Sequence, residues 1–344
     1  MIQNTFIAIF GGVLGLLLLL VARPFIQSAL VSPSEATHFA NIEDFHRKML
    51  ERDSRDVKTD HSVSLRSIIT PHPEPRIIYD LLPNQQVQFQ GVPVRINNCG
   101  MRGQDVAVEK PAHVLRVLFL GDSFSFGWGV EEHLAFPAVT EQVLNRFVRT
   151  QDPNIEVEVL NMGVPGYSTF QQVDLFLERG ADFRPDIVVV FFISNDFGLP
   201  FFISDVRSNG GVISGQEFSK LHSNGDAAAK TEHEKLVKML DPNRAFRRLL
   251  KMGASQGFET YLAINPKPDW LDMLKRLWIT KKSSKLHVLR LRERFLEGMK
   301  SFELTPEQLS LPNDPHPSAA KHALLGSLIA ESLFPEVERI VPVL

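Results

Sequence analysis

A serine that directly follows an apolar run is the first candidate for chemistry in this sequence of 344 residues. Residues 114–120 read VLRVLFL, and Gly121-Asp122-Ser123 comes next. Such a run predicts a buried strand, so Ser123 would stand at the carboxyl end of a parallel sheet, where open α/β folds place their sites. A serine at that point is also a common helix N-cap. A phosphate loop is excluded, because neither G-x-G-x-x-G spacing nor a Gly-Lys-Ser/Thr run follows.

Three further polar segments close predicted strands or open the last predicted helix: 161–168 (NMGVPGYS), 194–196 (SND) and 313–317 (NDPHP). Because neighbouring parallel strands bring their carboxyl ends together, we expect these segments to converge on Ser123. A serine becomes a useful nucleophile when an imidazole removes its proton and a carboxylate fixes the tautomer of that imidazole. His316 and Asp314 are the candidates for these two roles.

Acyl transfer at Ser123 would also need hydrogen-bond donors for the oxyanion of the tetrahedral intermediate. Three groups are candidates: the backbone N–H of Ser123, the backbone N–H of Gly166, where the missing side chain allows close approach, and the carboxamide of Asn195. Asp122 and Asp196 are interpreted as structural acids that accept hydrogen bonds from loop N–H groups. The sequence thus predicts a catalytic triad with an oxyanion hole.

Taken together, these segments resemble the SGNH branch of the GDSL hydrolase superfamily over roughly residues 112–335. Ser123 lies in a segment similar to the nucleophile block, Gly166 and Asn195 match the two oxyanion blocks, and His316 matches the general base. Residues 96–103 (INNCGMRG) also resemble a lead-in of membrane-anchored bacterial members. The resemblance implies a serine esterase or acylhydrolase that needs no metal or organic cofactor.

The sequence departs from the family pattern at two positions. Ile193 stands where the third block usually has glycine, and Asn313 stands where the last block usually has its acid. The candidate acid, Asp314, therefore lies two residues before His316 instead of three. If Asp314 pointed away, Asn313 would be the alternative partner of the imidazole.

The pattern of apolar runs predicts a three-layer α/β/α sandwich with a five-stranded parallel sheet. The resemblance implies that this fold is of the flavodoxin-like SGNH type. The five expected strands lie at 114–120, 156–160, 187–193, 259–264 and 286–291. The expected helices lie at 137–149, 169–179, 235–252, from about 268, and at 318–334. A polar stretch at 204–234 is expected as an insertion.

The N-terminus predicts a membrane anchor, because residues 2–22 carry no charge and include five consecutive leucines. We expect three parts: a transmembrane anchor at 1–26, a polar stalk or lead-in at 27–110, and the hydrolase domain at 111–344. The resemblance places such a domain on the outer face of the cytoplasmic membrane. A cleaved signal peptide is the alternative, disfavoured because no basic residue precedes the apolar run.

Composition excludes several classes of protein. A net charge of -3 excludes a globally basic nucleic-acid binder, and the single cysteine excludes an intrachain disulfide or a Cys-based zinc site. Spacing of the 11 histidines does not favour a metal site. Charge is nevertheless uneven, since residues 235–294 hold 15 Lys+Arg against 5 Asp+Glu, which suits an anionic lipid or glycan, or a solvated helix face.

The function predicted from the sequence is cleavage of an acyl ester, with cell-envelope polysaccharide or lipid as the expected substrate. A carbohydrate O-acetyltransferase that uses the same triad is the first alternative. A catalytically inactive glycan-binding module is the second. The oligomeric state does not follow from the sequence.

Overall fold

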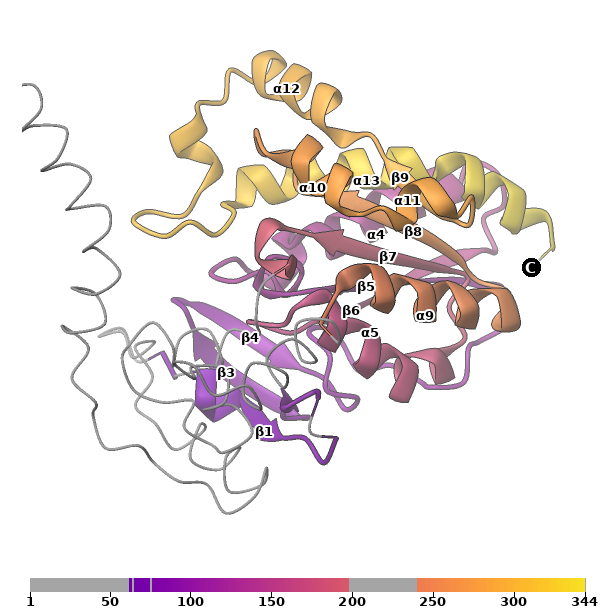
Figure 1. Ribbon diagram of the computed structural model, residues 1–344, viewed down its shortest axis with the longest axis horizontal. Helices are drawn as coiled ribbons and strands as arrows, with labels where there is room; N and C mark the ends of the chain where they lie inside the picture. The colour runs from indigo at the N-terminus through magenta and orange to yellow at the C-terminus, as the bar shows by residue number, and fades with distance from the viewer. Residues whose placement is uncertain (1–61, 64, 75, 198–239, 344) are drawn as a thin grey trace, which may run out of the picture.

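A five-stranded parallel sheet forms the centre of the computed structural model, which describes residues 62–63, 65–74, 76–197 and 240–343 (Figure 1). Its strands are β5 (Val114–Gly121), β6 (Glu156–Gly163), β7 (Ile187–Phe192), β8 (Glu259–Ile264) and β9 (Leu286–Leu289). Their order in the sheet is β6-β5-β7-β8-β9. The expected α/β fold is thus confirmed, with all five strands where the apolar runs predicted them.

The sheet is covered by helices on both faces, which explains why its inner strands are apolar without alternation. Every residue of β5 and β7 is buried. One face of β5 packs with α4 (Phe136–Val148) and α13 (Ala319–Ile340), and the other packs with α5 (Thr169–Glu178) and α9 (Pro242–Gln256). Figure 1 shows α13 on one side of the sheet and α5 with α9 on the other.

The chain reverses its direction of strand addition between β5 and β7. The first strand added, β6, lies on one side of β5, whereas β7, β8 and β9 follow on the other side. In open α/β sheets the crevice at such a switch point, at the carboxyl ends of the strands, is where ligands bind. The segments after β5 and β7 are those that carry Ser123 and Asn195.

Smaller helices complete the second half of the chain. They are α10 (Trp270–Arg276), α11 (Ile279–Lys282) and α12 (Leu291–Ser301). Helix α9 begins after Asp241, whose side chain accepts a hydrogen bond from the backbone of Asn243, and it ends at Gly257 in the left-handed conformation. The stretch 235–239, expected as the start of this helix, lies outside the described residues.

Two antiparallel hairpins precede the sheet, in the segment expected as a stalk or lead-in. Strands β1 (Ile69–Pro71) and β2 (Tyr79–Leu81) form the first, and β3 (Gln85–Phe89) and β4 (Val92–Ile96) form the second. Apolar side chains of both hairpins share one buried cluster with α5 and α9. The described part of this segment is therefore packed against the helices that cover the sheet. The division of the chain at residue 110 stays a prediction.

The closing helix also differs from the expectation, which ended it at residue 334 before a proline. Helix α13 continues through Pro335 to Ile340. Proline removes one backbone hydrogen bond. The turns beyond it bury Val337 and Ile340 in the core, and this burial holds the helix together.

The predicted anchor at 1–26 and the predicted insertion at 204–234 lie outside the described residues. Within the described parts of the chain, no helix combines the length and apolarity needed to cross a membrane.

Candidate active site

Ser123 opens the one-turn helix α3 (Ser123–Phe126), directly after β5. Asp122 caps this helix: its Oδ1 accepts a hydrogen bond of 2.9 Å from the backbone N–H of Phe124. Gly127 ends the helix at a φ of 84°, which favours glycine. Ser123 is 8% exposed and lines a cavity of about 560 Å³ at the carboxyl end of the sheet.

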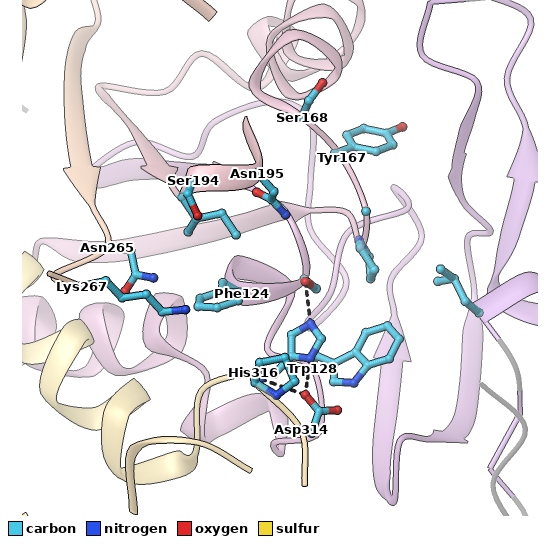
Figure 2. A pocket seen from close by; sticks show the side chains of 16 residues that line it. Phe124, Trp128, Tyr167, Ser168, Ser194, Asn195, Asn265, Lys267, Asp314 and His316 are labelled. Atoms are coloured by element: carbon cyan, nitrogen blue, oxygen red, sulfur yellow. Dashed lines mark hydrogen bonds and ion pairs between the residues drawn. The ribbon is translucent and has the colours of Figure 1, made fainter. Parts of the chain in front are cut away.

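Ser123, His316 and Asp314 form a continuous chain of hydrogen-bonding atoms (Figure 2). His316 Nε2 lies 2.9 Å from Ser123 Oγ, and His316 Nδ1 lies 2.6 Å from Asp314 Oδ1. An ionised carboxylate only accepts, so Nδ1 carries a proton and Nε2 is free to accept the proton of the serine. The geometry is that required of a nucleophile, a base and an orienting acid.

The conformation of the loop before α13 determines whether Asp314 or Asn313 contacts the imidazole of His316. The N–H of Leu311 donates to the carbonyl of His316 at 2.9 Å, and Asp314 Oδ1 accepts from the backbone N–H of His316 at 2.8 Å. Asn313 sits in the left-handed region, at a φ of 60°, and its side chain is exposed. In the structure, therefore, Asp314 and not Asn313 contacts the ring of His316.

Trp128 supports the imidazole from its face. The two rings stack with centroids 4.9 Å apart and an angle of 14° between their planes. On its other side Trp128 packs edge-to-face against Phe89 of β3, at 4.9 Å. The stacking of Trp128 on His316 was not foreseen from the sequence.

Arg102, from the segment 96–103 that resembles a family lead-in, fixes the turn after α3. Its buried guanidinium donates to the carbonyl oxygens of Phe126, Gly127 and Val130. Burial lowers the pKa of Arg102 to about 10, so it remains charged at neutral pH. The segment thus has a physical role that its sequence did not reveal.

All three candidate oxyanion donors line the same cavity. Ser123 is the first residue of α3, so its N–H has no acceptor within the helix. Gly166 has a φ of 83°, a conformation that favours glycine. Asn195 directs its Nδ2 toward Asp122 Oδ2, at 3.3 Å. This hydrogen bond holds the Asn195 carboxamide at the rim of the site.

The turn that carries Asn195 accommodates Ile193 in the place of the usual glycine. The short 3₁₀ turn η4 (Ser194–Phe197) begins after β7, and the Ile193 N–H donates to Asp196 Oδ2 at 2.7 Å. The side chain of Ile193 is buried in the same cluster as Phe124. An isoleucine here therefore adds core packing without unfolding the turn.

Two buried carboxyl groups lie beneath the cavity. Burial raises the pKa of Asp122, and burial together with the charge of Asp122 raises the pKa of Asp196 to about 8. Asp196 Oδ1 accepts from Thr169 Oγ1 at 2.8 Å and lies 3.1 Å from Gln172 Nε2. Both acids accept hydrogen bonds from loop N–H groups, as the sequence predicted.

Metal ligation has no candidate in the described ranges, where no group of three His, Cys, Asp or Glu side chains is placed to hold an ion. The cavity wall is instead made of aromatic rings, backbone and the polar side chains of the residues named above, joined by Asn265 and Lys267. Neither Asn265 nor Lys267 was singled out in the sequence, where nothing distinguishes them from other polar residues after a strand.

The parallel sheet, the cavity at its switch point and the contacts among serine, histidine and aspartate are those of an enzyme with a three-layer α/β/α fold. Residues 119–324 match the model of the GDSL-like lipase/acylhydrolase family. The chain belongs to this family, and it is a hydrolase that acts on ester bonds. No curated protein matches the sequence.

Several solved structures are similar. An acetylxylan esterase from Geobacillus stearothermophilus is 17% identical, with a TM-score of 0.41, and the match covers 64% of this chain and 94% of that chain. A family 3 carbohydrate esterase from Clostridium thermocellum is 11% identical, also with a TM-score of 0.41, over 66% of this chain and 99% of that chain.

Proposed function

We propose that this protein is a serine esterase that cleaves an acyl ester, O-acetyl esters included, with Ser123 as nucleophile. The observation that carries the proposal is the unbroken chain of contacts from Asp314 through His316 to Ser123 Oγ at the cavity. A serine held at 2.9 Å from an imidazole nitrogen, with a carboxylate at 2.6 Å behind it, is arranged to lose its proton.

In the proposed reaction, Ser123 Oγ attacks the ester carbonyl carbon while its proton passes to His316 Nε2. Asp314 stabilises the imidazolium. The N–H groups of Ser123 and Gly166 and the carboxamide of Asn195 donate to the oxyanion. The intermediate collapses, and the alcohol leaves with the proton of His316. Water then attacks the acyl-enzyme by the same route, and the acid is released.

The proposed setting combines the N-terminal sequence, which suggests the anchor, with the family resemblance, which suggests the side of the membrane. Residues 2–22 lack charge, and a helix of this length and apolarity would anchor the enzyme to a membrane. We place the catalytic domain on the outer face of the bacterial cytoplasmic membrane, where polysaccharide and lipid esters of the envelope would be its substrates.

A fluorophosphonate probe tests the nucleophile, because it modifies only activated serines. We expect one equivalent of label at Ser123, found by mass spectrometry, and none in Ser123→Ala or His316→Ala. Both variants should lose at least about a thousandfold in kcat for an aryl acetate. Ser125→Ala is the matched control: Ser125 lies buried in the same turn, its Oγ has no partner within the described residues, and labelling should persist.

The role of Asp314 is tested by Asp314→Asn, which should lower kcat by roughly a hundredfold or more, because the imidazole loses its carboxylate. Asn313→Gly is the control for this variant. Asn313 is exposed, and glycine readily adopts its left-handed backbone conformation, so the variant should leave kcat unchanged. Label on another serine, or full activity of Ser123→Ala, would overturn the proposal. Release of the acyl group to an added sugar in place of water would identify a transferase with the same triad.

A further inference from the structure

The segment after β8 brings a positive charge to the wall of the catalytic cavity. Lys267 lines this cavity together with Ser194, and Figure 2 shows its side chain directed toward Phe124. The backbone of the segment is fixed, since the Asn265 N–H donates to the Phe192 carbonyl at 2.9 Å and the Lys267 N–H donates to the Asn265 carbonyl at 2.8 Å. Lys267 therefore projects from a defined position beside the nucleophile.

A second lysine lies behind the same aromatic ring. Lys321, in the first turn of α13, is only 6% exposed, and its Nζ lies 5.5 Å from the centre of the Phe124 ring. Burial and the charge of Lys267 lower the pKa of Lys321 to about 8, so the two ammonium groups act on each other electrostatically. Phe124 follows Ser123 directly, so both charges lie close to the reaction centre.

Neither lysine has an ion-pair partner in the part of the chain that the structure describes. The carboxylate on the cavity wall, Asp314, is engaged with His316, and Asp122 accepts from the helix N-terminus and from Asn195. Lys267 is exposed to solvent whereas Lys321 is buried, so an anion bound at Lys267 would reduce the repulsion that Lys267 exerts on the buried ammonium group of Lys321.

Asn265 supplies a polar group in the same wall. Its side chain is 1% exposed, and its Oδ1 has no hydrogen-bond partner among the described residues. A buried polar atom of this kind is costly unless something pairs with it. A hydroxyl group of a ligand in the cavity would provide that partner.

We propose that Lys267, Lys321 and Asn265 form a subsite for a carboxylate or phosphate group on the ester substrate. Lys267 contacts the anion, Lys321 adds positive potential from behind Phe124, and Asn265 accepts a hydrogen bond from a neighbouring hydroxyl. The substrate class is thus an acyl ester of a hydroxylated, negatively charged molecule. The inference rests on the proposed esterase function and specifies its substrate.

Three aryl acetates that differ only in the para substituent test the subsite: a carboxylate, a phosphonate and a neutral carboxamide. Acetate release is measured on the full chain, and each kcat/KM is divided by the rate of spontaneous hydrolysis of the same ester. We expect the wild type to favour at least one of the two anionic esters over the carboxamide by about tenfold or more. The better of the two identifies the anion.

Variants then locate the preference. Lys267→Gln should bring the ratio of anionic to neutral ester close to one, and Lys267→Glu should invert the ratio. Lys321→Met, which replaces the buried stem with one of similar shape, should lower the ratio in part. Lys275→Gln is the matched control, because Lys275 is exposed on α10 and should leave the ratio unchanged.

The outcomes separate this inference from the proposed function. If the carboxamide ester is hydrolysed through Ser123 but the wild type shows no preference, the subsite is wrong and the esterase stands. If the preference survives Lys267→Glu, the anion is bound elsewhere and the assignment is overturned. If none of the three esters is turned over and no fluorophosphonate label appears, the proposed function itself fails.

Discussion

The acid pair beneath the cavity shows how single residues set the pH response of the site. Asp196 is fully buried, and its neighbour Asp122 lies close enough to raise the pKa of Asp196 further. Gln172 Oε1 has no hydrogen-bond partner within the described residues, so a flip of that amide would let it accept the proton of a neutral Asp196. A protonated Asp196 therefore fits its surroundings.

Asp196→Asn should flatten the pH dependence of stability. An aspartate in the unfolded chain loses its proton near pH 4, whereas Asp196 in the folded chain keeps it to about pH 8. The folded state then binds more protons in this window, so the free energy of unfolding falls as pH rises from 4 to 8. We expect wild type to lose about 2 kcal/mol more than Asp196→Asn between pH 5 and 8 in urea titrations.

The exposed Asp182 provides the control for this measurement, since Asp182→Asn should follow the wild-type curve. Equal slopes for wild type and Asp196→Asn would show that Asp196 is ionised in the folded protein. The three donors around its carboxylate would then outweigh the cost of burial.

Individual site residues were predictable where chemistry limits the choice. The contact among Ser123, Asp314 and His316 could be predicted because few residue types suit a nucleophile, an orienting acid and a base, and because each follows a strand or precedes a helix. Trp128 and Lys267 were not assigned roles, because packing and electrostatic fields depend on neighbours from distant segments. The sequence left open whether Asp314 or Asn313 contacts the imidazole. In the structure Asn313 adopts a left-handed backbone conformation, and the carboxylate of Asp314 contacts the ring of His316.

At the scale of elements, the position of α3 depends on two glycines that face each other at the ends of β5 and β6. Gly121 pairs in register with Gly163. A Cβ on Gly163 would lie 2.4 Å from the backbone nitrogen of Phe126 and 2.8 Å from the Ser125 carbonyl carbon. The helix that begins with Ser123 is thus seated directly on the sheet, and only glycine leaves the space.

Gly163→Ala should displace α3 and with it the nucleophile. The atoms in the way are two backbone atoms and the Cβ of Ser125, none of which moves when a side chain rotates, so the strain cannot be relieved in that way. We expect a loss of about 1–3 kcal/mol in the free energy of unfolding and a fall of at least about tenfold in kcat/KM. Chemical denaturation and aryl acetate hydrolysis measure the two effects.

Gly257→Ala is the matched control, because Gly257 has a φ of 89° and a Cβ on it would meet no atom of the described residues within 4 Å. It should cost about 1 kcal/mol through backbone strain and leave kcat/KM unchanged. If Gly163→Ala kept full activity while losing as much stability as Gly257→Ala, the position of α3 on the sheet would not control the nucleophile.

Elements were predictable where they are long and uniformly apolar. Strand β7 is an unbroken hydrophobic run, and among the apolar residues of β5 only Arg116 is charged, because helices cover both faces of these strands. Both hairpins before the sheet were missed. The strands of the first have three residues each, too few to show a period, and strand β4 of the second contains Pro93, which is unusual inside a strand. The end of α13 was misplaced because burial beyond Pro335 outweighs the local effect of proline.

At the scale of the whole molecule, the N-terminal hairpins are connected by packing to His316, the proposed base. Phe89, fully buried on β3, packs edge-to-face on Trp128, which stacks in turn on His316. Phe89 also lies 6.0 Å from the ring of Phe126 at the end of α3. A segment expected as a stalk or lead-in therefore supports both the serine helix and the histidine.

Phe89→Ala should reduce stability and activity together. The cavity left by the ring should lower the free energy of unfolding by about 3–5 kcal/mol, and the loosened Trp128 should lower kcat several-fold at temperatures where the protein stays folded. Phe258→Ala removes a similarly buried ring, packed on Phe176 at the amino end of β8. It should cost similar stability with an unchanged kcat, and an equal fall in kcat for both variants would contradict the coupling.

The hydrogen bonds between Tyr79 and the loop around Gly166 join segments that are synthesised at different times. The Tyr79 hydroxyl donates to the Pro165 carbonyl, and the Tyr167 hydroxyl donates to the Tyr79 carbonyl, across separations of 86 and 88 positions. A ribosome adds about 5–20 residues per second, so β2 waits several seconds for these partners. His316 follows Ser123 by 193 positions. The nascent chain is therefore expected to stay catalytically silent until His316 has been synthesised.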